Sequence, residues 1–303
     1  MLGVVITFIV TFFVLSFPLP FLPVDQGRAF AVNGKLSKGK VRGIGLCLVL
    51  CFVVGSAIFV PLDREYVIYL ILLTCSMISG YLDDASKAPW SDYKKGLIDL
   101  MISVMTMITY VNFNDTAVYV GEYVLTLPKA VYFILGILLL WISINVTNCT
   151  DGVDGLCATL CIVTLMSFSA ILGEALGKYA AANYILIAVL LAYLYFNTSP
   201  SSMLMGDAGS RALGFYIAVI AMKSRQPFMF LPLALVLILD GGLGLVKIFL
   251  KRFLKISIFK NIRLPLHVQA RKAHGWSDTQ VVVRFTMAQI LVSILTYVIL
   301  TGE

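Results

Sequence analysis

Charged residues are scarce in this sequence. Asp, Glu, Lys and Arg make up 13% of the 303 residues, 60% are hydrophobic, and the mean hydropathy is +0.94. Soluble domains carry about a quarter charged residues. The composition therefore excludes an ordinary soluble domain and predicts an integral membrane protein.

Ligands for soft metals are also few. The chain has two histidines and six cysteines, and no two cysteines stand in a CxxC spacing. A zinc site or a disulfide framework would need paired thiols or clustered histidines. Neither is expected here.

Long apolar runs occur along the whole chain. Runs of about 20 apolar residues are long enough to span a bilayer as helices. We therefore predict an all-α polytopic membrane protein with about ten transmembrane helices, forming a single domain over residues 1–303. The predicted runs cover residues 2–22, 44–61, 66–82, 97–111, 129–145, 156–173, 181–197, 209–223, 227–250 and 281–301.

Loop charge predicts the orientation. The loops after the first and ninth runs are rich in Lys and Arg, and basic loops stay in the cytoplasm. With ten helices, both termini would face outward. Lys223 and Arg225 are the one pair that contradicts this rule.

Four polar clusters fall in the loops that this topology places on the cytoplasmic face. They read "GYLDDASKAPWSDYKKG", "NVTNCTDGVDGLC", "FNTSPSSMLMGDAGSRALG" and "LPLHVQARKAHGWSD". Chance would distribute such clusters over both faces, so we predict one composite active site on the cytoplasmic face.

The residue types in these clusters indicate phosphate chemistry. Carboxylates are hard ligands that suit Mg²⁺, or Mn²⁺, with a substrate phosphate completing the coordination. The "GDAGS" segment leads into a helix, whose N-terminal N–H groups favour anions. Candidate ligands are Asp83, Asp84, Asp151, Asp154 and Asp207, and candidate phosphate-neutralising cations are Lys87, Lys94, Lys95, Arg263, Arg271 and Lys272.

Each motif also has a structural interpretation. "DGVDG" alone could be a tight turn, Asp207 alone a helix N-cap, and His267 alone a structural hydrogen-bonding residue. Asp240 lies inside the ninth apolar run, next to Gly241 and Gly242. A carboxylate at that depth is functional or paired, and the glycine pair favours a bent helix with Asp240 in a structural role.

"DDASK", "NVTNCTDGVDGL" and "MGDAGSRALG", in this order, resemble the polyprenyl-phosphate N-acetylhexosamine-1-phosphate transferase superfamily. "PLH" followed by "GWSDTQVVVRF" is most similar to its bacterial phospho-N-acetylmuramoyl-pentapeptide transferase branch. The resemblance implies Mg²⁺-dependent transfer of phospho-MurNAc-pentapeptide from its UDP carrier to undecaprenyl phosphate, which forms lipid I and UMP.

The resemblance also implies roles for individual residues. Asp207 would bind the metal, Asp83 and Asp84 would orient or deprotonate the lipid phosphate, and His267 would contact the sugar or the pyrophosphate. Lys87 and Lys94 would contact phosphate. The remaining candidate substrate-binding residues are Asn145, Asn148, Asp151, Asp154 and Asn197.

The chain departs from the family pattern in several places, and two of these departures affect the candidate site residues. "HVQ" stands where the family usually has three histidines, so only His267 is carried over. The first loop matches the family's glycine-rich segment loosely, which leaves Lys35, Lys38 and Lys40 as alternatives for a substrate-binding lysine.

Two alternative functions remain open. A transferase that uses UDP-GlcNAc would need the same loops, and the basic "ARK" after His267 resembles that branch. An ion-coupled transporter would place its carboxylates near the middle of the membrane. We expect a multi-pass protein of the bacterial cytoplasmic membrane whose partners are the two substrates and the bilayer. The resemblance suggests a homodimer, and no nucleic acid is expected.

Overall fold

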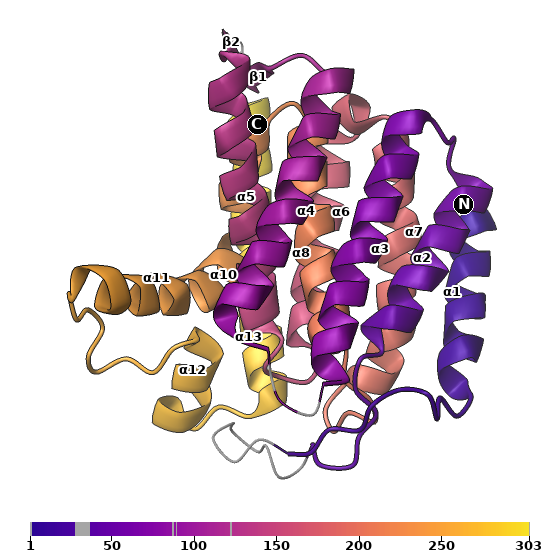
Figure 1. The fold of residues 1–303 in the computed structure, drawn as a ribbon, viewed down its shortest axis with the longest axis vertical. Coiled ribbons are helices and arrows are strands. Elements are labelled where there is room, and N and C mark those ends of the chain that lie inside the picture. The colour runs from indigo at the N-terminus through magenta and orange to yellow at the C-terminus, as the bar shows by residue number, and fades with distance from the viewer. Residues whose placement is uncertain (1, 28–36, 87, 89, 122, 303) are drawn as a thin grey trace.

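The computed structural model describes residues 2–27, 37–86, 88, 90–121 and 123–302. Long helices lie side by side in one bundle (Figure 1). The chain runs through α1 (Leu2–Ser16), α2 (Gly45–Phe59), α3 (Arg64–Asp84), α4 (Asp92–Phe113), α5 (Lys129–Thr150), α6 (Leu156–Leu176), α7 (Lys178–Asn197) and α8 (Gly206–Lys223). It ends in α13 (Asp278–Thr301).

Every apolar run predicted from the sequence carries helix. Among the described residues, α3, α4, α5, α6, α7 and α13 are long and apolar enough to cross a membrane, and a bent pair of helices could add a seventh span. α1 and α2 are apolar but shorter. The protein is therefore a mostly helical polytopic membrane protein, and the count of ten crossings and their orientation stay predictions.

Helix α8 forms the centre of the bundle. Every residue from Gly206 to Met222 is buried, and α8 packs against α3 and α5. A helix that is buried all round needs small residues where its neighbours cross it. Glycines meet at the crossing with α2, where a Cβ atom on Gly45 would lie 1.9 Å from the Gly209 nitrogen.

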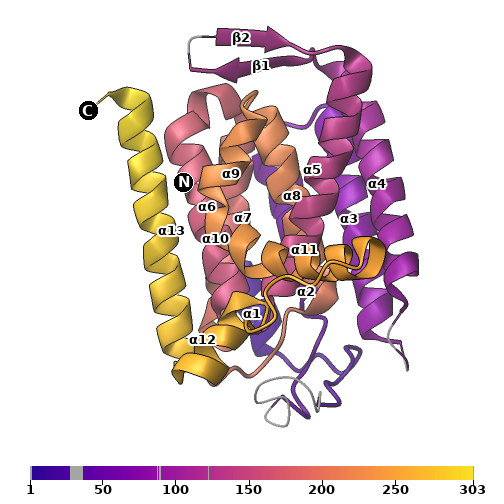
Figure 2. The same cartoon turned by 90° about the vertical axis from the view of Figure 1, so that its left-hand side faces the viewer.

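The ninth apolar run is a broken helix, as expected, but the break lies at Ala234 and not at the Gly241–Gly242 pair, which falls within a π-helical segment. Two short segments, η1 (Pro227–Met229) and α9 (Phe230–Leu233), precede a break at Ala234, and the chain bends there by 74°. α10 (Leu235–Leu237), the π-helical η2 (Ile238–Gly242), α11 (Leu243–Phe249) and the π-helical η3 (Leu250–Leu254) follow. Figure 2 shows α11 crossing the side of the bundle. The short helix α12 (Leu266–His274) then lies below it.

The two ends of the bundle differ. A hairpin of β1 (Ala117–Val120) and β2 (Tyr123–Thr126) covers one end, and both chain termini lie toward it (Figures 1 and 2). The described parts of the first loop, residues 17–27 and 37–44, and α12 lie at the other end. The motif loops thus gather opposite the hairpin, which agrees with the single composite site expected from the sequence.

Lys223 and Arg225, the two cations that contradicted the rule that basic loops are cytoplasmic, are paired with acidic residues at the hairpin end. Lys223 donates to both carboxylate oxygens of the buried Glu65, at 3.1 and 3.0 Å, and to Asn114 at 2.6 Å. Arg225 pairs with Asp115 at 3.1 Å. Because both charges are paired, they add little to the positive charge of that end.

Candidate active site

Three carboxylates meet where α3 ends and α8 begins. Asp83 and Asp84 are the last two residues of α3, and Asp207 lies in the first turn of α8. The side chain of Asp84 is completely buried, and those of Asp83 and Asp207 are nearly so. Carboxylates buried this deeply need cationic or hydrogen-bonding partners.

Two cations bridge the three carboxylates. The Arg42 guanidinium donates to Asp84 at 2.7 Å, to Asp25 at 3.1 Å and to Asp207 at 3.4 Å. Lys95, in the first turns of α4, pairs with Asp83 and donates to Asp207 at 3.0 Å. Asp207 therefore contacts both cations and lies at the centre of the cluster.

Backbone groups fix the carboxylates further. Asp84 accepts the Ala208 N–H at 3.1 Å, and Asp83 accepts the Trp90 N–H at 2.8 Å. The Asp84 bond ties the end of α3 to the start of α8. The cluster is thus held in place by main-chain donors as well as by the two cations.

Main-chain hydrogen bonds of the first loop fix the position of the Arg42 backbone, independently of its side-chain contacts. The Arg42 N–H donates to the Pro23 carbonyl at 2.8 Å, and Val41 forms bridges with Val24 and Met203. The segment that precedes α8 is therefore joined to the first loop. Although burial alone would lower the pKa of Arg42, the charge of Asp84 and its other carboxylate partners raise it above its ordinary value.

Asp25 anchors Arg42 from the opposite side. Burial would raise the pKa of Asp25, but the Gly27 N–H, the Ser37 hydroxyl and Arg42 together lower it. Ser37 donates at 2.9 Å and Gly27 at 2.8 Å. Asp25 therefore stays ionised and holds one edge of the guanidinium while the other edges face Asp84 and Asp207.

Two glycines allow α3 and α8 to approach each other. A Cβ atom on Gly80 would lie 2.3 Å from the Asp207 carbonyl oxygen. Gly206 has φ +73°, and a Cβ atom there would lie 2.3 Å from Asp84 Oδ2. Only glycine fits such positions without displacing the neighbouring groups.

The charge of the cluster suits a divalent cation. Four carboxylates, Asp25, Asp83, Asp84 and Asp207, face the two cations Arg42 and Lys95, so two negative charges remain unbalanced. Within the described residues, no group of three or more Asp, Glu, His or Cys side chains is placed so that it could hold a metal ion. Mg²⁺ commonly uses one or two carboxylates and takes its other ligands from water and substrate phosphate. The residues present therefore fit a divalent-metal site only if one or two of these carboxylates bind the ion and substrate phosphate and water supply its other ligands.

The loops after α5 and α7 meet beside this cluster. Asp154 accepts the Ser201 N–H at 2.9 Å and lies 3.6 Å from the Lys40 ammonium. Lys40 also donates to the Ser201 hydroxyl at 2.9 Å. Asn197 accepts the Gly155 N–H at 2.9 Å and donates to the Met203 carbonyl at 2.9 Å. In this structure Asp154 and Asn197 hold the two loops together, and of the first-loop lysines that the structure describes, Lys40 reaches them.

The end of α5 places its polar residues at different distances from the cluster. Asn148 donates to Ser210 of α8 at 3.0 Å, one turn beyond Asp207. Asn145 donates to the Trp141 carbonyl of its own helix at 2.8 Å. Asp151 is half-buried at the start of the "DGVDG" loop. Asn148 thus contacts the helix that carries Asp207 directly.

His267 is held by the carboxylate in the broken helix. Asp240, fully buried in η2, accepts the His267 N–H at 2.8 Å and lies 2.8 Å from its Nδ1. The opposite ring nitrogen faces the loop after α5, where a Cβ atom on Gly152 would lie 2.4 Å from Nε2. Asp240 thus orients the histidine toward the "DGVDG" loop, which gives the buried carboxylate its structural partner.

Some predicted cations lie apart from the carboxylates. Lys94 stacks its ammonium over the Trp90 ring at 3.3 Å. Arg271 pairs with Asp278 at 2.8 Å and approaches the Gly152 carbonyl at 3.4 Å. Lys87 and Lys35 lie outside the described residues.

The sequence reasoning missed three members of the cluster as catalytic candidates. Arg42 and Asp25 stood in a loop whose match to the family was loose, and Lys95 was named among several cations without a specific role. The signal that could have found Arg42 is its place immediately before Gly43 and the start of α2, a short connection that cannot move far from α8. No pattern in the sequence pairs it with Asp25.

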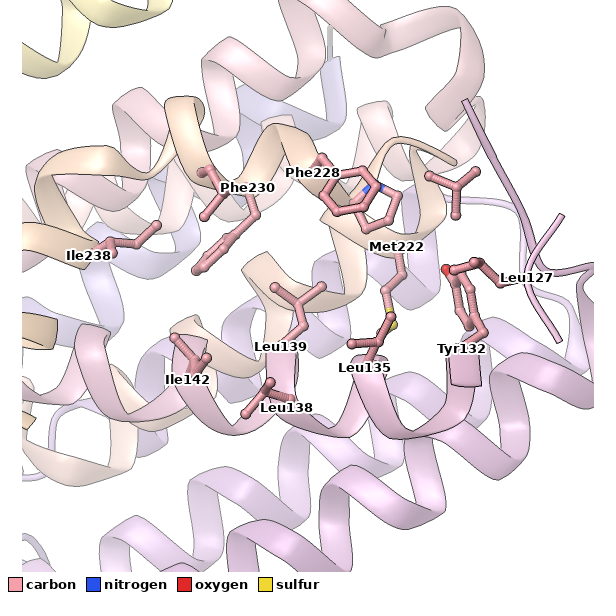
Figure 3. Close-up of a pocket in the computed structure, with 14 residues that line it drawn as sticks. Leu127, Tyr132, Leu135, Leu138, Leu139, Ile142, Met222, Phe228, Phe230 and Ile238 are labelled. Atoms are coloured by element: carbon pink, nitrogen blue, oxygen red, sulfur yellow. The ribbon is translucent and has the colours of Figure 1, made fainter. Parts of the chain in front are cut away.

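A separate apolar pocket of about 330 Å³ lies at the side of the bundle. Figure 3 shows Leu135, Leu139 and Ile142 of α5 facing Phe228 and Phe230 across it. None of the described residues that line the pocket is charged. It suits a hydrocarbon chain and offers no counter-charge to a phosphate group.

A comparison with known families identifies the class of protein. The model of the family described as glycosyl transferase family 4 matches residues 66–225. The chain belongs to this family. The matched region runs from α3 to the end of α8 and includes Asp83, Asp84 and Asp207.

Individual relatives place the chain within the family. It is 36% identical to the phospho-N-acetylmuramoyl-pentapeptide-transferase of Treponema pallidum, over 95% of this chain and 85% of that protein. The transferase of the same name from Campylobacter lari is 28% identical, over 84% and 79%. That of Dictyoglomus thermophilum is 28% identical, over 71% and 70%. The resemblance to the muramoyl branch is therefore confirmed.

Proposed function

We propose that the protein transfers phospho-MurNAc-pentapeptide from UDP-MurNAc-pentapeptide to undecaprenyl phosphate, forming lipid I and UMP. The observation that carries the proposal is the 36% identity to the Treponema pallidum transferase over nearly the whole chain. The carboxylate and cation cluster supports it, because phosphoryl transfer needs charges that position and neutralise phosphate groups.

Asp83 and Asp84 would position the phosphate of the lipid acceptor. A phosphate monoester has a second pKa of about 6 and is mostly a dianion at pH 7. The acceptor therefore needs orientation toward the β-phosphate of the donor more than it needs a base. Lys95 and Arg42, which contact these carboxylates, would offset the charge of the incoming phosphates.

Asp207 would be the protein ligand of a divalent metal, Mg²⁺ or alternatively Mn²⁺. Its central place between Arg42 and Lys95, with two negative charges of the cluster unbalanced, supports this role. When bound, the metal would stabilise negative charge on the departing UMP.

The donor would bind between the loops after α5, α7 and η3. Asn148 and Asp151 lie at the end of α5, and Asp154 and Asn197 join the α5 and α7 loops. His267, oriented by Asp240, would contact the sugar or the pyrophosphate from α12. Asn145, Lys87 and Lys94 remain proposed substrate contacts.

The environment of the protein follows from the same proposal. The chain would act as a single domain in the bacterial cytoplasmic membrane, with the active site on the cytoplasmic side and both termini outside. Its partners would be the nucleotide donor, the polyprenyl acceptor and the bilayer. Assembly as a homodimer is part of the proposal.

The test is UMP release by the detergent-purified protein with undecaprenyl phosphate and Mg²⁺, comparing UDP-MurNAc-pentapeptide with UDP-GlcNAc. Asp207→Asn is the control variant, because a neutral amide keeps the shape of the side chain and loses most of its attraction for a cation. We expect UMP from the pentapeptide donor and none from Asp207→Asn.

Other outcomes would change the assignment. Release from UDP-GlcNAc alone would move the protein to the GlcNAc branch with the same metal site. Release from neither donor would restore the transporter hypothesis. Near-normal turnover by Asp207→Asn would remove Asp207 as the metal ligand.

A further inference from the structure

A second pocket lies between α11, the loop that follows η3, and α12. Its volume is about 480 Å³. Gly241, Gly244 and Leu245 line one side, and Val268 of α12 lines another. Cys149, near the end of α5, also reaches it. The pocket therefore adjoins both the helix that carries His267 and the helix that ends at the "DGVDG" loop.

The lining of this pocket is strongly basic. Lys247, Lys260, Arg263 and Lys272 contribute to it, and its described lining contains no Asp or Glu. Lys247 donates to the carbonyls of Phe259 and Ile262, at 2.8 and 2.9 Å, so it braces the wall of the pocket. The positive charge of the other three cations remains available to a ligand.

The acids around the pocket are already engaged. Asp240 binds His267, Asp278 pairs with Arg271 at 2.8 Å, and Asp92 lies 3.6 Å from Arg252. In the part of the chain that the structure describes, the side-chain nitrogens of Lys260, Arg263 and Lys272 have no hydrogen-bonding or ion-pair partner. Three cations that share a pocket repel each other unless an anion joins them.

We propose that this pocket binds the carboxylates of the donor's peptide. The inference rests on the proposed function, because a muramoyl-pentapeptide carries a carboxylate at least at its peptide terminus. A donor whose sugar reaches His267 would extend its peptide along α12 toward Lys272. The apolar lining residues, among them Leu245, Ile262 and Val268, would contact the aliphatic parts of the peptide.

This pocket would distinguish the two candidate donors. UDP-GlcNAc has no peptide and cannot engage Lys260, Arg263 or Lys272. The muramoyl-pentapeptide gains ion pairs there without any change at the reacting phosphates. Interactions with a remote part of the substrate that are equal in the ground and transition states lower KM and leave kcat unchanged.

The experiment compares the wild-type protein with the triple variant Lys260→Gln/Arg263→Gln/Lys272→Gln on two donors. One donor is UDP-MurNAc-pentapeptide, and the other is the same molecule with its peptide carboxyls converted to primary amides. Lys251→Gln is the matched control, because it removes an exposed cation of the same region that does not line the pocket.

We expect the triple variant to raise KM for the acidic donor about ten-fold, because the loss of three partly exposed ion pairs weakens binding by roughly this factor. The value of kcat should stay within about two-fold of the wild type. KM for the amidated donor should be the same in wild type and variant. The Lys251→Gln protein should behave as wild type with both donors.

Three results would overturn the proposal. These are an equal rise in KM for both donors, no rise for either, or a fall in kcat at constant KM. If the variant instead loses a stimulation that vesicles of phosphatidylglycerol give to the wild type, with unchanged KM for the donors, the ligand is a lipid headgroup. Should the triple variant fail to fold, Arg263→Gln and Lys272→Gln are measured singly, with a smaller rise expected for each.

The same assay separates this inference from the proposed function. Wild-type turnover of UDP-MurNAc-pentapeptide tests the function by itself, and the ratio of KM values for the acidic and amidated donors tests the pocket. A wild-type protein that uses the acidic donor with the same KM as the amidated one keeps the function and loses the pocket. Absence of turnover on both donors removes both.

Discussion

Replacing Arg42 with Gln should destabilise the metal-free protein and strengthen its response to Mg²⁺. The guanidinium contacts Asp25, Asp84 and Asp207, and its side chain is 15% exposed. Breaking a buried ion pair costs about 3–5 kcal/mol when the partner is left uncompensated. Asp84 would keep the Ala208 N–H and Asp207 would keep Lys95, so we expect the lower end, about 3 kcal/mol.

The assay is thermal unfolding of the detergent-purified protein, with and without Mg²⁺ and in the absence of substrates. A loss of about 3 kcal/mol corresponds to a fall in Tm of about 5 °C for a chain of this size. The variant also changes the formal charge of the cluster from minus two to minus three. Mg²⁺ should therefore bind more tightly and raise the Tm of Arg42→Gln more than that of the wild type, since ligand stabilisation grows with the ratio of ligand to Kd.

Lys40→Gln is the matched control for this prediction. Lys40 lies in the same loop, but its partners are Ser201 and Asp154 and it does not contact Asp207. Its loss should lower Tm by less and leave the Mg²⁺ response unchanged. The reasoning is refuted if Arg42→Gln melts with the wild type in metal-free buffer, or if its Mg²⁺ response does not exceed that of the wild type.

Two further substitutions test the supports of the site. Asp240→Asn keeps the shape of the side chain but weakens its hold on His267, so Tm should fall by about 1.5–2 °C per kcal/mol lost. Turnover per folded molecule should fall less, whereas a normal Tm with lost turnover would indicate a catalytic carboxylate. Gly80→Ala places a methyl group against the Asp207 carbonyl, so it should separate α3 from α8 and abolish UMP release. Normal turnover by Gly80→Ala would show that the helices can move apart at no cost.

The positions of the helices could be predicted from the sequence because each apolar run is uniform over its whole length. The predicted runs 129–145 and 181–197 became α5 (Lys129–Thr150) and α7 (Lys178–Asn197). The polar ends of these helices were harder to place. The predicted run ended at residue 145, but α5 continues to Thr150, because polar residues such as Asn148 bond to α8 inside the bundle.

Short elements were not predicted. The hairpin of β1 and β2 has four residues in each strand, and the fully exposed pattern of β2 carries no apolar alternation. The helix α12 has nine residues, and its sequence LHVQARKAH contains few apolar ones. Such segments take their conformation from the surface against which they pack, which a single sequence does not contain.

The partners of the side chains in the carboxylate cluster were also only partly predictable from the sequence. Asp83, Asp84 and Asp207 could be found because they lie in motifs predicted to share one face of the membrane. Arg42, the cation that joins Asp84 to Asp207, is 42 residues from Asp84 and 165 residues from Asp207 in the chain. A charge in a loop gives no sign of which carboxylate it will reach. Arg42 becomes identifiable once the backbone bonds of Val41 and Leu204 are known, since they join the first loop to the start of α8. An arginine placed by main-chain bonds beside three carboxylates is part of the construction of the site, and comparing the Mg²⁺ response of Arg42→Gln with that of the wild type measures how much its positive charge opposes the binding of a divalent cation there.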